Sequence, residues 1–148
     1  MTTVCSCGSG RNAGECCEPL HRGQPAQTPE QLMRARYSAY VRHQDTFLMA
    51  SWHPSTRPAE LTHEPGLLWR HLDVSHSDHT DDTGSVHFSA TWQQGERWGI
   101  LQEKARFTRE AGHWYYLDGD VSHLPLTPER NKDCPCGSGR KYKRCCRP

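Results

Sequence analysis

The sequence has few apolar residues and no long apolar run. Hydrophobic residues make up 34% of its 148 positions, and the mean hydropathy is −0.89. No apolar stretch approaches the roughly 20 residues that a membrane-spanning helix needs, so we expect no membrane partner. The segment before Cys5 is too short for the charged start and apolar core of a secretory signal. These features predict a cytoplasmic protein with one compact domain of ordinary size.

Cysteine is absent from the middle of the chain, because the 116 residues between Cys17 and Cys134 contain none. The ends carry two copies of one pattern, C-x-C-x8-C-C, over residues 5–17 and 134–146, with eight of thirteen positions identical. Such a repeat indicates two copies of one small structural unit. The eight cysteines are Cys5, Cys7, Cys16, Cys17, Cys134, Cys136, Cys145 and Cys146.

Clustered cysteines in a reducing cytosol usually bind metal. Zn²⁺ takes four thiolates in a tetrahedron, and C-x-C on a tight turn followed by C-C on a short helical turn supplies them. The Gly-Ser-Gly after each C-x-C lets the backbone turn back on itself with positive φ. We therefore predict two Zn²⁺ ions per chain, each in a closed structural site that stabilises a segment too small to fold alone.

Three other uses of these cysteines stay open at this point. Disulfides would require an oxidising compartment. An iron–sulfur cluster also takes four cysteines, but at wider spacings. The adjacent Cys145 and Cys146 are also compatible with a redox-active thiol pair.

Two or three helices are predicted at the start of the central domain. Thr28-Pro29 is a typical helix start, and apolar residues then recur at helical spacing to about His43. A second, shorter helix is expected over residues 45–52, where Pro54 ends it.

A four-stranded antiparallel meander is predicted next, because apolar residues alternate with polar ones and turn sequences separate the runs. In the first strand, Leu68, Leu72 and Val74 share one parity, and a polar hairpin loop is expected over residues 77–84. The predicted strands cover residues 67–77, 86–92, 99–107 and 113–117.

The fold class that follows is α+β, with helices packed on a curved four-stranded antiparallel sheet in a cone-like arrangement. The expected organisation is an N-terminal zinc module over residues 1–22, the α+β domain over 28–126 and a C-terminal zinc module over 127–148.

Charge separates the two ends. Residues 1–22 carry no net charge, residues 23–126 carry −4 and residues 127–148 carry +5. A cationic module with an exposed tyrosine could meet an acidic protein surface or, with weaker support, RNA phosphate. The alternative is a solvated tail whose charge offsets the thiolates. The candidate contact residues are Arg140, Lys141, Tyr142, Lys143 and Arg144.

One candidate pocket lies in the central domain. Glu103 shares strand parity with apolar neighbours, which predicts an inward carboxylate that needs a partner. It is either a pocket acid, with His53 and Arg57 as further candidate pocket residues, or one half of a buried structural ion pair with Arg34, Arg36, Arg57 or His53. Histidines 71, 76 and 79 with nearby aspartates fit no closed metal motif and are read as part of a solvated hairpin.

The C-terminal repeat, Cys134–Cys146, resembles the SEC-C motif, the small zinc-binding tail of the bacterial preprotein translocase motor SecA. The last ligand of that motif is commonly histidine, where this chain has Cys146. The resemblance implies zinc and, by analogy, contact with a protein or the ribosome.

The middle of the chain is similar to the YchJ-like proteins, which have SEC-C ends and a middle domain like nuclear transport factor 2. This resemblance implies the cone-like fold and the metal, and names no reaction. The matching stretches are residues 32–40, 52–58, 103–107 and 114–119.

Together these features favour an interaction or adaptor protein, associated with the ribosome or translocation, over an enzyme. A small-molecule or enzymatic pocket in the central domain is the alternative. A third possibility is purely structural, with the two zinc modules holding the chain ends on the domain.

Overall fold

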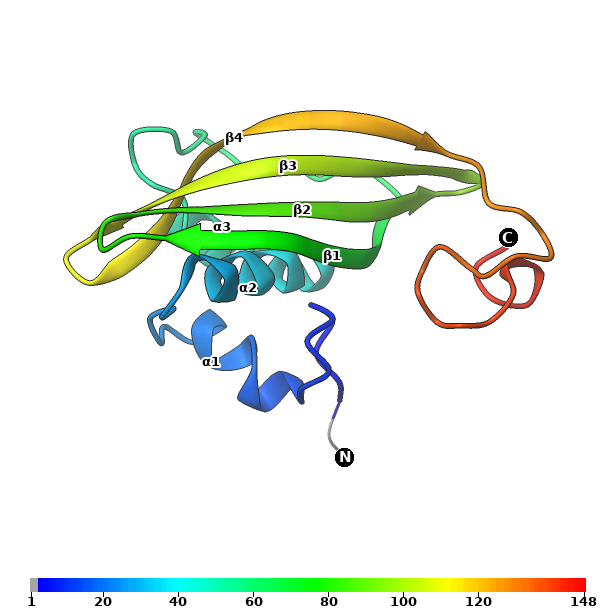
Figure 1. The fold of residues 1–148 in the computed structure, drawn as a ribbon, viewed down its shortest axis with the longest axis horizontal. Coiled ribbons are helices and arrows are strands. Elements are labelled where there is room, and N and C mark those ends of the chain that lie inside the picture. The colour runs from blue at the N-terminus through cyan, green and yellow to red at the C-terminus, as the bar shows by residue number, and fades with distance from the viewer. Residues whose placement is uncertain (1–2) are drawn as a thin grey trace.

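A computed structural model describes residues 3–148 of the chain, with four strands, three short or medium α-helices and two single turns of 3-10 helix (Figure 1). Within this range, no helix has the length and apolar character needed to cross a bilayer. In chain order the elements are η1 (Ala13–Glu15), α1 (Glu18–His21), α2 (Pro29–Arg42), α3 (Asp45–Ala50), β1 (Leu67–His79), β2 (Thr83–Gln94), β3 (Arg97–Glu110), β4 (His113–Leu126) and η2 (Tyr142–Arg144).

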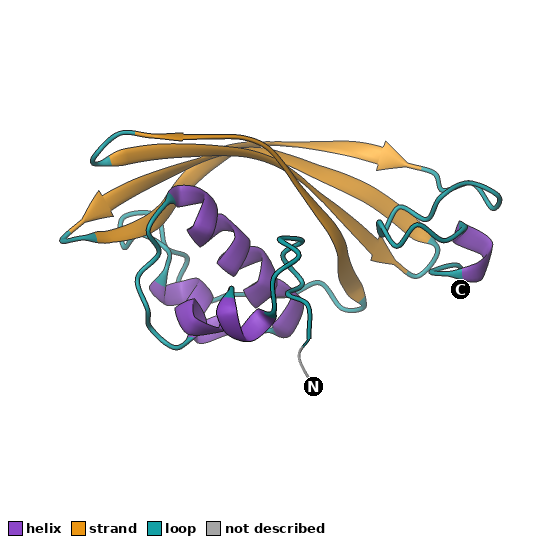
Figure 2. Ribbon diagram, turned by 60° about the horizontal axis from the view of Figure 1, so that its bottom comes forward, coloured by secondary structure: helices purple, strands orange, loops and turns teal. Residues whose placement is uncertain are grey.

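The four strands form one antiparallel sheet in the order β1-β2-β3-β4. The sheet is strongly twisted, and the helices gather on one of its faces (Figure 2). Helix α2 makes contacts with β1, β2 and β4. The predicted α+β class, with helices covering a curved four-stranded meander, is confirmed.

Helix α2 begins and ends where local chemistry predicts. The Thr28 hydroxyl accepts a hydrogen bond from the Gln31 N–H at 3.0 Å, and Pro29 occupies the first helical position. The helix ends at His43, whose φ of 54° and ψ of 45° are left-handed. The predicted helix from Thr28 to about His43 is confirmed.

Strand β1 differs from its predicted face pattern because it contains irregularities in register. One lies between Trp69 and His71. Such a bulge adds a residue and switches which side chains face the core. Trp69 therefore packs against the core together with Leu72, whereas Leu68 is 50% exposed. Leu68 and Leu72 share one parity in the sequence but do not share a face of the sheet, for this reason.

The strands are longer than predicted. The β1–β2 loop covers only residues 80–82, because pairing continues to His79 and Gly84. Strand β4 extends to Leu126, nine residues beyond its predicted end at Leu117. That second half pairs with the first half of β3 but is mostly exposed, so it lacks the alternation that marks a half-buried strand.

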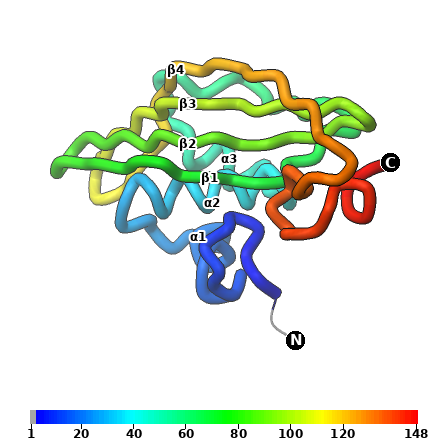
Figure 3. Tube along the Cα trace, turned by 45° about the vertical axis from the view of Figure 1, so that its right-hand side comes forward, coloured from blue at the N-terminus to red at the C-terminus, as the bar shows by residue number. Residues whose placement is uncertain are grey.

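The two ends of the chain attach to the domain differently. The N-terminal segment lies beside α2 and β1, and the C-terminal segment lies at one end of the sheet (Figure 3). Cys5, Cys7 and Cys17 belong to the same apolar cluster as α2 and the inner sheet face. Cys134 and Tyr142 form a second, small cluster with Trp98. The N-terminal module, residues 1–22 in the prediction, thus shares one core with the central domain, while the C-terminal module has its own small core.

Candidate metal centres

Each end of the chain folds into the same local structure around its first two cysteines. Cys5 N–H donates to the Arg11 carbonyl at 2.8 Å, and Cys134 N–H donates to the Arg140 carbonyl at 2.7 Å. Both glycines of each Gly-Ser-Gly have positive φ, between 82° and 84°. An L side chain rarely adopts this conformation, so glycine allows each turn to fold the C-x-C pair back toward the C-C pair.

The adjacent cysteines also have matching backbones in the two copies. The first of each pair, Cys16 and Cys145, has φ and ψ of −118° and −93° or −130° and −99°, outside the helical and extended regions. A 3-10 turn, η1 or η2, precedes each pair. This backbone directs both neighbouring sulfurs toward one point, which a regular helix or strand would not do.

The sulfur positions fit one tetrahedral ion in each cluster, and all four Sγ atoms lie within 4.8 Å of one another. Four sulfurs about 2.3 Å from one zinc ion are about 3.8 Å apart. The pairs Cys7–Cys16 and Cys136–Cys145 are separated by 3.6 and 3.5 Å, and each adjacent C-C pair by 3.8 Å. All eight cysteines are free thiols, so the structure does not support the disulfide alternative. Each cluster could hold one metal ion.

Neighbouring thiols shift one another's pKa in opposite directions. A hydrogen bond from Cys17 lowers the pKa of Cys7 to about 4, and donating that bond raises the pKa of Cys17. The Ser138 hydroxyl lowers the pKa of Cys145 to about 6, while burial raises the pKa of Cys146 to about 12. A bound cation would favour the ionised form of the four thiols in each cluster.

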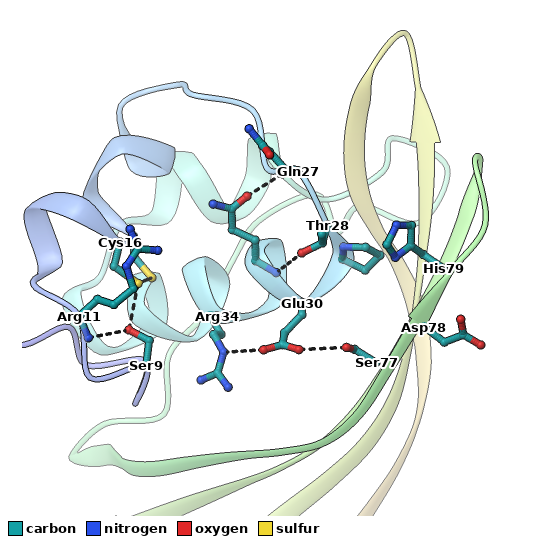
Figure 4. Close-up of a pocket in the computed structure, with 13 residues that line it drawn as sticks. Ser9, Arg11, Cys16, Gln27, Thr28, Glu30, Arg34, Ser77, Asp78 and His79 are labelled. Atoms are coloured by element: carbon teal, nitrogen blue, oxygen red, sulfur yellow. Dashed lines mark hydrogen bonds and ion pairs between the residues drawn. The ribbon is translucent and has the colours of Figure 1, made fainter.

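The N-terminal module is fastened to α2 by polar contacts. Arg34 donates to the Cys7 carbonyl at 2.9 Å, and the Ser6 hydroxyl donates to the Ser38 hydroxyl at 2.9 Å. Beside these contacts lies a pocket of about 700 Å³, lined partly by Cys16 (Figure 4). The carboxylate of Glu30 crosses this pocket and bonds to both Arg34 and Ser77. Glu30 and Arg34 therefore already have partners.

The C-terminal module is anchored by an aromatic pair. The Trp98 indole N–H donates to the Tyr142 hydroxyl at 3.2 Å, and the two rings meet edge to face at 5.8 Å. Tyr142 is only 8% exposed. The expectation of an exposed Tyr142 in a contact surface was wrong, because Trp98 points to the outer sheet face and buries it.

Further contacts hold the module on the outer face of β1 and β2. The Gln93 amide donates to the Cys146 carbonyl at 2.9 Å and accepts from Arg70. Gly137 lies so close to the His71 ring that a Cβ there would be 2.7 Å from Nδ1. The module therefore has a defined position on the sheet.

The remaining candidate contact residues are charged and accessible. Arg140, Lys141 and Arg144 are exposed, and Lys143 is half-buried. Within residues 3–148, no ion pair joins a cation of the C-terminal module to a carboxylate. Arg140 donates a hydrogen bond to the Cys145 sulfur at 3.7 Å, and with Lys141, Lys143 and Arg144 it forms a positive surface without carboxylate partners among the described residues. We call it the free positive surface.

The three candidate pocket residues make separate contacts. Glu103 accepts a hydrogen bond from the Tyr116 hydroxyl at 2.5 Å and borders a shallow pocket of about 370 Å³. His53 bonds to Glu110, and Arg57 donates to the Trp52 carbonyl. Their side chains do not converge on one substrate position, so the geometry offers no support for shared chemistry.

Comparison with known proteins identifies the family. The sequence profile described as YchJ, middle NTF2-like domain, matches residues 28–119, and the SEC-C motif matches residues 130–148. The chain is also similar to a UPF0225 protein of Photorhabdus laumondii, with 41% identity over 99% of both sequences. The chain belongs to the YchJ family.

Two solved structures resemble this family member. A SEC-C motif protein of Rhodopseudomonas palustris, 30% identical, matches with a TM-score of 0.71 over 81% of this chain and 98% of its own. A second SEC-C motif protein, from Psychrobacter arcticus, is 25% identical and matches with a TM-score of 0.65 over 99% of this chain and 95% of its own. The resemblance stated from the sequence is confirmed.

One further cluster of metal-ligating side chains was missed by sequence reasoning. His43, Asp45 and His63 come together although the last two are 18 positions apart in the chain. No spacing motif links them. The one local sign was a histidine directly after a predicted helix end, where glycine is usual.

Proposed function

We propose that this YchJ-family chain is a zinc-stabilised adaptor whose C-terminal module contacts an acidic surface of a partner protein or of the ribosome. Both cysteine clusters are structural zinc centres in this proposal. Eight free thiols require a reducing compartment, so the proposed location is the cytoplasm.

Zinc is supported by the donor set and its spacing. In each cluster the four sulfurs lie within 4.8 Å of one another, and two of their separations are between 3.5 and 3.8 Å. Four thiolates at such distances match a tetrahedral zinc–sulfur centre and leave no position for water. Metal analysis of freshly purified, reduced, tag-free protein should give about two zinc ions per chain, in line with two four-thiolate centres. A ratio near zero, or iron in place of zinc, would contradict the assignment.

The free positive surface carries the adaptor proposal. The C-terminal module has seven Lys and Arg side chains against two acidic ones. Zinc with four thiolates has a formal charge of −2, so a net charge of about +3 remains. The contacts of Tyr142 and Gln93 fix the module on the sheet. The positive side chains are therefore held in a defined arrangement.

Charge reversal on this surface is the direct test. Lys141→Glu with Arg144→Glu should lower co-sedimentation with bacterial ribosomes, or recovery of a partner from native cells, by roughly tenfold or more at physiological salt. The matched control, Arg97→Glu with Lys104→Glu, changes the net charge equally on the central domain and should leave binding unchanged.

Zinc content and the NMR signal of the Trp98 indole N–H establish that both variants keep the module folded. Binding that persists after charge reversal in the module, or that falls equally in the control, would show that this surface is not the contact element. Ribonuclease treatment separates RNA from protein as the partner. If it abolishes ribosome binding but does not change the recovery of partner proteins, the ribosomal contact is with RNA, which contradicts an acidic protein surface.

A further inference from the structure

Two imidazoles and one carboxylate converge where α2 ends. His43 is the residue that ends α2, Asp45 is the first residue of α3, and His63 lies in the loop before β1. Their ligand atoms all lie within 4.8 Å of one another. His63 Nε2 is 2.8 Å from Asp45 Oδ1, and the His43 and His63 rings are 4.5 Å apart. Three separate segments thus bring nitrogen and oxygen donors to one place.

The backbone of His43 is unusual for a side chain of this size. Its φ of 54° lies in the left-handed region, and glycine or asparagine is the ordinary residue where a helix ends this way. Histidine accepts this conformation at some cost in free energy. The conformation directs the imidazole toward His63 instead of along the helix surface.

The surroundings hold the cluster and favour a cation. The Tyr40 ring meets both His63 and Trp69 edge to face, which fixes the second imidazole. A cavity of about 150 Å³ adjoins the histidines and is bordered also by Glu64. The guanidinium of Arg42, next to His43 in the chain, bonds to Glu18 on α1 and so has a carboxylate partner outside the cluster.

We propose that His43, Asp45 and His63 form a third metal site that takes a first-row divalent transition ion such as Zn²⁺. Two histidines and one carboxylate are the donor set that zinc uses in sites with an open position, and imidazole suits such ions. When the ion binds, the hydrogen bond between His63 and Asp45 opens. The imidazole proton then sits on Nδ1 while Nε2 ligates.

This site differs from the cysteine clusters in its coordination. Each cluster of four thiolates closes the shell of its ion, whereas three protein donors leave room for water or a small ligand. The adjoining cavity of about 150 Å³ provides that room. The third ion is therefore expected to exchange readily, while the ions in the cysteine clusters stay bound.

Zinc titration of tag-free protein with both cysteine clusters already loaded tests the proposal. Isothermal calorimetry should show one further equivalent of Zn²⁺ per chain. His43→Gly, Asp45→Asn and His63→Ala should each weaken this event at least tenfold. His123→Ala, which removes an exposed histidine of β4 far from the cluster, is the control and should bind as the unmodified chain does.

His43→Gly is the decisive variant, because glycine relieves the left-handed backbone while it removes the imidazole. Its melting temperature should be equal or higher without added zinc, so loss of binding cannot be ascribed to unfolding. If the unmodified chain bound no further equivalent of Zn²⁺, the cluster would be only an ion pair between His63 and Asp45. A further equivalent that survives His43→Gly and His63→Ala would be an adventitious ion only. Either result overturns the proposal.

Discussion

Glu103 lies on the inner face of the sheet, where a carboxylate is costly unless it is paired. Its direct partner is the Tyr116 hydroxyl. The buried Arg36 guanidinium stacks on the Tyr116 ring at 4.6 Å and donates to the Leu48 carbonyl and the Ser51 hydroxyl. Arg36 and Glu103 thus meet through a tyrosine, which is a looser link than a direct ion pair.

Burial dominates the ionisation of Glu103 and raises its pKa above the ordinary value of 4.5. The folded state therefore holds the proton more tightly than the unfolded state, and stability is lost as pH rises through this range. We expect Glu103→Gln to gain stability relative to the unmodified chain as pH increases from about 4 to about 7. Thermal melts across this range measure the difference.

Glu96→Gln, at the exposed β2–β3 turn, is the control and should show no such trend. A Glu103→Gln variant that instead becomes progressively less stable with rising pH would mean that Arg36 and Tyr116 stabilise the ionised form, and that the pKa of Glu103 is lowered.

At the scale of the element, α2 is specified by its own N-terminal residues. Thr28 caps the Gln31 N–H, and the Gln31 side chain accepts in return from the Gln27 N–H. Thr28→Ala should lower the free energy of unfolding by about 1 kcal/mol, because one N–H at the helix start loses its partner. Thr28→Ser keeps a hydroxyl and should lose much less.

Urea denaturation of both variants measures this effect. Equal loss in the alanine and serine variants would show that packing of the threonine methyl group, and not capping, stabilises this helix start.

Strand β4 shows the opposite case, an element that depends on its neighbour. Trp114, near its start, packs in the main core and the next residues are half-buried, whereas Val121 and Leu124 remain 49% and 42% exposed. Pairing with β3 maintains this half, from Trp98–Leu126 to Glu103–Val121. Backbone hydrogen bonds to a partner strand do not require alternating apolar and polar side chains, so the sequence of this half of β4 shows no such alternation.

At the scale of the whole molecule, two modules with the same local geometry have different roles in stability. The N-terminal cysteines are part of the main core, while the C-terminal cysteines pack only with Trp98, Tyr142 and their neighbours. Loss of the N-terminal ion should therefore destabilise the entire domain. Loss of the C-terminal ion should release only the tail.

Cys16→Ser and Cys145→Ser are a matched pair for this prediction, because they occupy equivalent positions in the repeat and are both half-buried. Amide hydrogen exchange in zinc-loaded protein should show faster exchange across β2 and β3 in Cys16→Ser. In Cys145→Ser, exchange should accelerate only in residues 127–148, and the Trp98 indole signal should shift.

Comparable loss of protection in the sheet for both variants would contradict this division. It would mean that the contacts of Gln93 and Trp98 couple the C-terminal module to the domain as strongly as the core couples the N-terminal one.

The sequence by itself determined the cysteine repeat, the start and end of α2 and the four-stranded meander. Spacing, capping and alternation are properties of neighbouring residues, so they can be read along the chain. The matching turns at Cys5–Arg11 and Cys134–Arg140 follow from the same eight shared positions.

Only the tertiary structure decided where these units attach and which distant side chains meet. The bulge after Trp69, the burial of Tyr142 under Trp98 and the joining of His43 to His63 depend on register and packing between segments far apart in the chain. Such contacts form because the twisted sheet brings distant segments of the chain together in space. A pattern among neighbouring residues carries no information about which distant segments will meet.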